Sequence, residues 1–123
     1  MNLQTPLSRV LGLGSAKEGV EHWWWQRLTA LALVPLGIWF VVVVISMVGA
    51  DYATARTWVA QPVNMVLLIA FVAALLHHGQ LGLQVVIEDY VHREAWKLTL
   101  LLAVKALSVL AFIWTVVLLF SVS

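Results

Sequence analysis

The residues in this chain whose types and spacing could do chemistry are His78 and Tyr90. His78 ends a long apolar run, and an imidazole within hydrocarbon is costly unless something compensates it, so its position indicates a functional site. Tyr90 lies twelve residues further on, about 18 Å along a helix, which would place it near the membrane surface. An imidazole can bind a metal, and a phenol can donate a hydrogen bond to a carbonyl such as that of a quinone.

Small residues surround His78 at helical spacing. Ala74, His78 and Gly82 are four apart and share a stripe, which Gly79 flanks. They leave a flat space beside the backbone, as a haem macrocycle would require, although close helix–helix packing uses the same residue types. The neighbouring His77 points about 100° away, so it cannot face the same ring and could instead bond a neighbouring helix. Spacing alone leaves open a haem ligand or a hydrogen-bonded structural histidine, and bis-histidine ligation would need a ligand from another chain.

The residues near the expected membrane surface each have a simple structural alternative. Tyr90 is either an interfacial anchor or a quinone hydrogen-bond donor, and Asp89 could orient its hydroxyl, pair with a cation or relay a proton. Arg27 is either a basic flanking residue or the partner of an anion such as a haem propionate. His22 could serve similarly or be simply exposed. Lys105 is expected to extend back to the surface and has no assigned function.

The composition identifies a membrane protein. Of 123 residues, 63% are hydrophobic and 11% are charged, against roughly 45–50% and about 25% in soluble domains. The absence of cysteine excludes disulfides and thiolate-bound iron–sulfur clusters within this chain. A net charge of +1 gives no support for nucleic-acid binding. Residues 1–20 lack the apolar core of a cleavable signal peptide, so the first span is expected to be its own insertion signal.

Three segments are long enough to cross a bilayer, at 28–49, 63–87 and 98–122. Each must be helical, because lipid offers no partner for backbone amides, and Pro35 is expected to kink the first. The prediction is an all-α bundle of three transmembrane helices. It divides the chain into a cytoplasmic segment, 1–27, and an anchor domain, 28–122.

The basic residues predict the orientation. Apart from Lys105, which lies within the third span, five of them flank one side of the spans and one, Arg56, flanks the other. This places the N-terminus in the cytoplasm and the C-terminus opposite. The five are Arg9, Lys17, Arg27, Arg93 and Lys97. Tryptophans are expected to anchor both interfaces, the cytoplasmic one with Trp23, Trp24, Trp25 and Trp96 and the far one with Trp58.

Two motifs resemble a known family. The first is His78-x-x-x-Gly82-x-Gln84-Val85-x-x-x-Asp89-Tyr90, and the second is His22-Trp23-Trp24-Trp25-Gln26-Arg27-Leu28-Thr29-Ala30. Together with the three spans they resemble the hydrophobic membrane anchor subunits of bacterial and mitochondrial-type succinate dehydrogenase (complex II). The resemblance covers nearly the whole chain, and the histidine-to-Asp-Tyr motif is its most specific part.

The resemblance implies roles residue by residue. His78 corresponds to an axial ligand of a b-type haem, with the second ligand from a companion cytochrome b anchor. Tyr90 corresponds to the tyrosine that hydrogen-bonds ubiquinone, with Asp89 beside it. Arg27 corresponds to the arginine near the haem propionates and the quinone. His22 corresponds less directly, since it stands one residue closer to Arg27 than in some relatives.

The resemblance also implies partners and a location. A flavoprotein subunit oxidises succinate, the electrons pass through an iron–sulfur subunit, and the two anchors hold both of these subunits at the bacterial inner membrane. Two other hypotheses remain at this point. One is an anchor of quinol:fumarate reductase, which the quinone and the direction of catalysis would distinguish. The other is a small helical transporter or assembly protein without a redox role, which would contain no haem.

Overall fold

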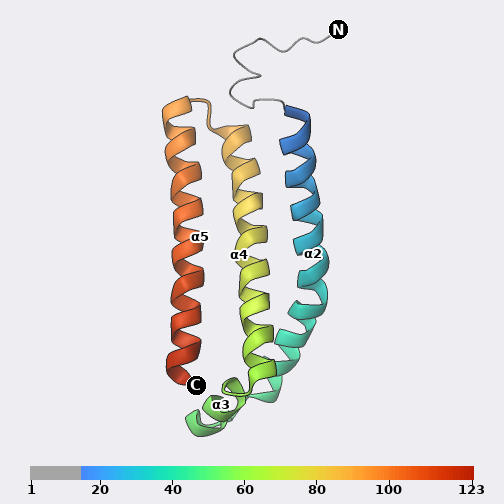
Figure 1. Ribbon diagram of the computed structural model, residues 1–123, viewed down its shortest axis with the longest axis vertical. Helices are drawn as coiled ribbons and strands as arrows, with labels where there is room; N and C mark the ends of the chain where they lie inside the picture. Colours follow the sequence, from blue (N-terminus) through green and yellow to red (C-terminus); the bar gives the residue numbers. More distant parts are fainter. Residues whose placement is uncertain (1–14) are drawn as a thin grey trace.

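The computed structural model describes residues 15–123. Within them the chain forms helices joined by short irregular segments and contains no strand, as an all-α prediction requires. The helices are α2 (Ser15–Ser46), α3 (Tyr52–Val59), α4 (Pro62–Tyr90) and α5 (Glu94–Val122) (Figure 1). Three of them contain stretches long and apolar enough to cross a membrane, at Gly19–Ser46, Pro62–Tyr90 and Glu94–Val122. The expected fold class is confirmed, and the chain is a multi-pass membrane protein.

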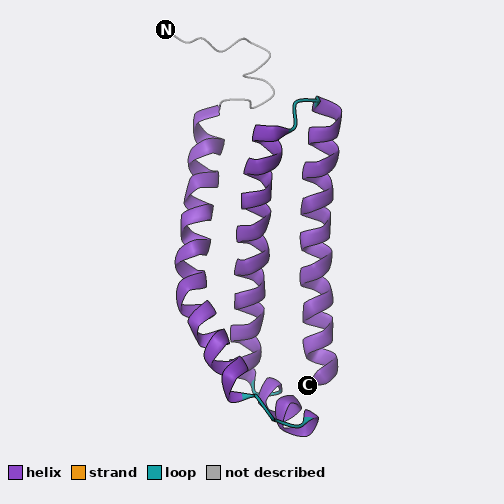
Figure 2. Cartoon of the chain, turned by 180° about the vertical axis from the view of Figure 1, so that it is seen from behind, coloured by secondary structure: helices purple, strands orange, loops and turns teal. Residues whose placement is uncertain are grey.

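The three long helices stand in a row with α4 in the middle. Figures 1 and 2 show α4 between α2 and α5, with the C-terminus and the short α3 at the same end. In the described residues, no Cα atom of α2 comes within 8 Å of one in α5. The helix that carries the His78-to-Tyr90 motif is therefore flanked on both sides by helices of its own chain, while the two broad faces of the row stay open.

This open row buries very little. Among the described residues, only Leu81 (6% exposed), Ile87 (9%) and Thr29 (7%) are buried. Large apolar side chains such as those of Leu31 and Trp114 stand exposed. In a membrane, lipid can cover apolar surface of this kind, and the broad faces of the row are also free to pack against other helices.

The helix ends differ from the span bounds expected from hydropathy. The chain leaves α2 at Ser46 and turns through Gly49, whose φ of 81° favours glycine, although the apolar run continues to that point. At the opposite end the helices extend into polar sequence, with α2 beginning at Ser15 and α4 continuing to Tyr90. Helices can project beyond the hydrocarbon, so these ends do not mark the membrane boundary. Residues 1–14, including Arg9 and half of the expected cytoplasmic segment, lie outside the described residues.

Local sequence explains the other boundaries. Pro62 opens α4, where its missing N–H costs nothing. Glu94 stands in the first turn of α5, where a negative charge is favoured. Its Oε1 lies 3.7 Å from Nζ of Lys97. Pro35 lies within α2, and this helix bends in its second half (Figure 2), as proline-containing helices do.

Aromatic contacts hold the end of the row near α3. The rings of Phe40 and Phe71 stack at 4.6 Å between α2 and α4, and those of Trp39 and Trp58 stack at 6.0 Å between α2 and α3. Helix α3 itself occupies the connection between the first and second expected spans. Asp51 caps it by accepting a 2.9 Å hydrogen bond from the Thr54 backbone N–H.

Candidate functional site

The imidazole of His78 faces α2. Its Nδ1 lies 3.1 Å from Oγ1 of Thr29, the one buried polar side chain of the described residues. The Thr29 hydroxyl also lies 2.7 Å from the backbone oxygen of Trp25 and 3.2 Å from that of Gln26. A hydrogen-bonded chain thus connects the histidine of α4 to the backbone of the neighbouring helix.

Open space adjoins His78 along α4. A Cβ atom built on Gly79 or Gly82 would meet nothing within 4 Å. The two glycines are therefore not used for close packing between helices of the described chain, which was the alternative explanation for small residues at this spacing. They leave room for a flat group or for a helix of another chain.

The donor set around His78 restricts how it could bind a metal. No group of three or more His, Cys, Asp or Glu side chains in the described part of the chain could hold a metal ion. A protein-held zinc ion requires three or four such ligands. A haem requires only one or two from the protein, because the porphyrin supplies the others. A single imidazole beside open space fits a haem better than a metal ion held by side chains alone.

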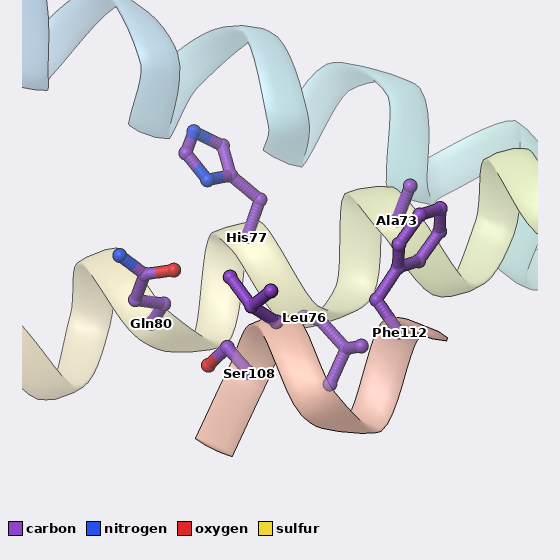
Figure 3. Close-up of a pocket in the computed structure, with 7 residues that line it drawn as sticks. Ala73, Leu76, His77, Gln80, Ser108 and Phe112 are labelled. Carbon is purple, nitrogen blue, oxygen red and sulfur yellow. The ribbon is translucent and has the colours of Figure 1, made fainter. Parts of the chain in front are cut away.

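His77 has different surroundings from His78. Its ring lies edge-on to that of Trp25 at 5.5 Å. It also lines an open cavity of about 210 Å³ between α4 and α5, together with Gln80, Ser108 and Phe112 (Figure 3). Among the described residues, His77 makes no hydrogen bond to a neighbouring helix, and its contact with α2 is the one with the Trp25 ring. The two histidines thus have separate environments, as the helical rotation between them predicts.

The polar side chains near the start of α2 are only partly paired. The Arg27 guanidinium lies 5.5 Å from the ring centre of Trp23, a cation–π contact. One turn earlier, His22 has a buried Nε2 without a hydrogen-bond partner in the described chain, and Oε1 of Gln26 is in the same state. A buried polar atom without a partner is costly. His22 is therefore not a merely exposed histidine, because its Nε2 is buried and lacks a partner among the described residues.

The last two side chains of α4 are exposed to solvent. Tyr90 is 78% exposed, Asp89 is exposed, and neither side chain makes a hydrogen bond within the described residues. Of the three roles open to Asp89, orientation of the Tyr90 hydroxyl by a hydrogen bond is not seen among the described residues. Earlier in α4, the Gln84 side chain donates a 3.0 Å hydrogen bond to the carboxylate of Glu88.

The surroundings of two residues near the site, Thr29 and Lys105, were not predicted from the sequence. Thr29 stands 49 positions from His78, a separation that no helical spacing connects, and a threonine within an apolar helix attracts no attention by itself. Lys105 lines the groove between α4 and α5 with Gln80 and Gln84. The polar glutamines beside it are the signal in the sequence that could have marked this groove.

Taken together, the three long apolar helices in an open row define a class of protein: a multi-pass membrane protein with three transmembrane helices. The family model of the succinate dehydrogenase/fumarate reductase transmembrane subunit matches residues 1–120. The chain belongs to this family, which favours a redox anchor over a transporter or an assembly protein.

Individual relatives agree with the family match. The succinate dehydrogenase hydrophobic membrane anchor subunit of Rickettsia bellii is 36% identical, over 87% of this chain and 86% of the relative. The subunit of the same name from Paracoccus denitrificans is 31% identical, over 73% and 70%. The succinate dehydrogenase membrane anchor subunit of Reclinomonas americana is 28% identical, over 76% and 80%.

Proposed function

We propose that this chain is the membrane anchor subunit of succinate:ubiquinone oxidoreductase, that it supplies one axial ligand of a b-type haem, and that it forms part of the quinone-reduction site. The observation that carries the haem proposal is the His78 imidazole, held by α2 through Nδ1 with open space at the adjacent glycines. The relatives named above are succinate dehydrogenase subunits, which favours this enzyme over quinol:fumarate reductase.

The proposed haem would be held by two chains. His78 would provide one axial nitrogen, and the companion cytochrome b anchor would provide the other. Arg27 and His22 are the proposed partners of the propionates, because Arg27 carries a fixed positive charge and His22 has a buried, unpaired Nε2. When bound, a haem supplies a one-electron redox centre whose potential depends on its axial ligands and their hydrogen bonds.

The proposed quinone site lies at the exposed end of α4. Reduction of a quinone takes up two electrons and two protons, so a position near water allows protons to arrive while the electrons come from a peripheral subunit. The Tyr90 phenol can donate to one ubiquinone carbonyl and stabilise the negative charge that develops there. Asp89 beside it can take up or release protons. The iron–sulfur subunit would enclose this site, which the exposure of Tyr90 supports.

The proposed complex has four subunits, and its flavoprotein and iron–sulfur subunits would be docked at the cytoplasmic surface. This chain would take no part in the oxidation of succinate. Residues 1–27 would form the cytoplasmic segment and residues 28–122 the anchor domain, surrounded by lipid of the bacterial inner membrane. The N-terminus would be cytoplasmic and the C-terminus periplasmic.

The test of the haem proposal is His78→Ala in the purified complex of all four subunits, with His77→Ala as the matched control. The alanine at position 78 removes the ligand, so we expect b-type haem to be lost or the complex to fail to assemble. His77→Ala is expected to retain haem, because the His77 ring packs against Trp25 and lines the open cavity between α4 and α5. The measurement is the visible spectrum of the reduced complex per mole of flavin.

One result would overturn the assignment of His78. It is a haem-containing His78→Ala complex whose axial-ligand spectrum equals that of the natural protein. The direction of catalysis and the co-extracted quinone, measured on the same preparation, distinguish succinate oxidation with ubiquinone from fumarate reduction with a quinone of lower potential.

A further inference from the structure

We infer that Thr29 is a positioning residue for the haem ligand: it fixes His78 in the tautomer that keeps the Nε2 lone pair free for iron. The inference rests on the proposed role of His78. It concerns a residue on a different helix from the ligand, and it follows from the hydrogen-bond geometry at the Thr29 hydroxyl.

The first step is the position of the hydroxyl proton. A threonine hydroxyl has one hydrogen to donate and two lone pairs that accept. At Thr29 the nearest acceptor is the Trp25 backbone oxygen, at 2.7 Å, the usual length of an O–H···O hydrogen bond. A threonine within a helix can make this bond to the carbonyl of the residue four positions earlier. Thr57, Thr99 and Thr115 of this chain each make it at 2.8 Å.

The second step is the proton on the histidine. Because the hydroxyl proton points to the backbone, the oxygen of Thr29 can only accept from His78 Nδ1, and their separation of 3.1 Å is normal for N–H···O. A neutral imidazole carries one proton. With that proton on Nδ1, the Nε2 atom presents a lone pair, which is the state in which histidine binds a metal. Histidine ligands commonly donate their other ring N–H in this way, which fixes both tautomer and ring orientation.

The third step is the environment of the bond. Thr29 is 7% exposed, so water does not compete for the hydroxyl, and a hydrogen bond in such surroundings is stronger than one in water. Thr57, Thr99 and Thr115, which bond their own helices, make no hydrogen bond to a histidine of the described residues. Thr29 thus differs from them in being both buried and shared between two helices, which ties the ligand of α4 to α2.

The bond should also influence the haem iron. An acceptor at Nδ1–H draws the proton away and makes Nε2 a better electron donor, which favours ferric over ferrous iron. Loss of the acceptor should therefore raise the haem midpoint potential. We expect the midpoint potential to rise by up to about 59 mV. For a one-electron couple this corresponds to a tenfold change in the ratio of ferric to ferrous haem at a given potential.

The experiment compares four purified complexes: the natural one, Thr29→Val, Thr29→Ser and Thr115→Val. Valine keeps the shape of threonine and removes the hydroxyl, and serine restores the hydroxyl. Thr115→Val removes an equivalent hydroxyl from α5 that bonds only Ala111. The measurements are the midpoint potential of the haem and the electron paramagnetic resonance spectrum of its ferric form. We expect Thr29→Val alone to raise the potential and change the spectrum.

Each other outcome has a defined meaning. If Thr29→Val keeps the potential and spectrum of the natural complex, the inference is wrong, while the role of His78 is unaffected. If Thr29→Ser shifts both as far as valine does, packing of the methyl group is responsible and the inference is again wrong. Should the Thr29→Val complex not assemble, the potential and spectrum of a Thr29→Ala complex are measured instead, because alanine only removes atoms. An unchanged potential and spectrum in that complex would likewise refute the inference. Absence of haem from the natural complex would instead refute the proposed function itself.

Discussion

At the scale of single residues, Tyr90 is the side chain whose removal should separate quinone chemistry from haem binding. Tyr90→Phe deletes only the hydroxyl of a 78% exposed side chain, so the fold should not change. A hydrogen bond to a group that gains charge is worth about 1.5–3 kcal/mol. We therefore expect quinone reduction to slow by roughly 10- to 100-fold while the haem content stays constant. Steady-state succinate:quinone kinetics of the purified complex measure this.

The chain provides a matched control for that prediction. Its other tyrosine, Tyr52, begins α3 at the opposite end of the row and is also exposed. Tyr52→Phe is expected to leave quinone kinetics unchanged. Equal rates in the Tyr90→Phe complex and the natural one would remove Tyr90 from the site.

The site residues differ in how far sequence could identify them. His78 was recognisable because a polar ring within an apolar run is unusual, and Tyr90 because it follows at a fixed helical distance. Thr29 was not, because its importance depends on a contact between helices 49 positions apart. Spacing rules describe neighbours on one helix, and partners on another helix depend on how the helices rotate against each other. The same limit left the surroundings of His77 and His22 open.

At the scale of elements, hydropathy located the three spans because lipid requires long apolar helices. Hydropathy did not identify α3, because a short helix outside the membrane depends on its N-cap rather than on a long apolar sequence. The signal was local: Asp51 precedes Thr54 at the spacing of an N-cap. The turn at Gly49 was missed for a similar reason, because backbone conformation, not hydropathy, ends α2 there.

The cap at Asp51 predicts a dependence of α3 on pH. Hydrogen bonds from the Thr54 side chain and backbone lower the pKa of Asp51 below its usual value of 3.8. A lowered pKa in the folded state means that the charged cap stabilises α3 above about pH 3.8 and loses this effect as the pH falls through the lower value. Backbone amides of residues 54–59 should therefore exchange faster, after correction for intrinsic rates, only below that window.

Substitutions at position 51 test the cap directly. Asp51→Asn keeps a capping oxygen but cannot titrate, so its α3 amides should show no such pH step. Asp51→Ala should exchange faster at every pH. Hydrogen exchange followed by mass spectrometry on the intact complex distinguishes the three chains, and a step of unchanged size in Asp51→Asn would show that a different group titrates.

At the scale of the whole molecule, the open row explains why the site is incomplete in this chain. Helix α4 contacts α2 on one side and α5 on the other, which fixes the direction of the His78 ring but leaves the broad faces of the row free. The glycines beside His78 open into space, and the buried atoms of His22 and Gln26 have no partners among the described residues. Open space and unpaired polar atoms on the free faces of the row are what one layer of a larger bundle would have.

The orientation of this row decides which subunits can reach Tyr90, and the chain is well suited to measure it. It contains no cysteine, so a single introduced cysteine reports one position without background. Ala95→Cys lies at the start of α5, near the end of α4, whereas Ser123→Cys lies at the opposite end of the row (Figure 1). Because the basic residues predict a cytoplasmic N-terminus, a membrane-impermeant maleimide should label position 95 only in inverted vesicles. It should label position 123 only in right-side-out vesicles.

A third position checks that the two labels report topology rather than local accessibility. Ala53→Cys is exposed on α3 and should behave as position 123 does, since α3 and the C-terminus share one end of the row. The cysteine-free chain is the control for labelling of other groups. The reversed pattern would place Tyr90 at the periplasmic surface, beyond reach of a cytoplasmic iron–sulfur subunit. The proposed quinone site would then be wrong even if His78 binds haem, because electrons from succinate would have to cross the bilayer to reach it.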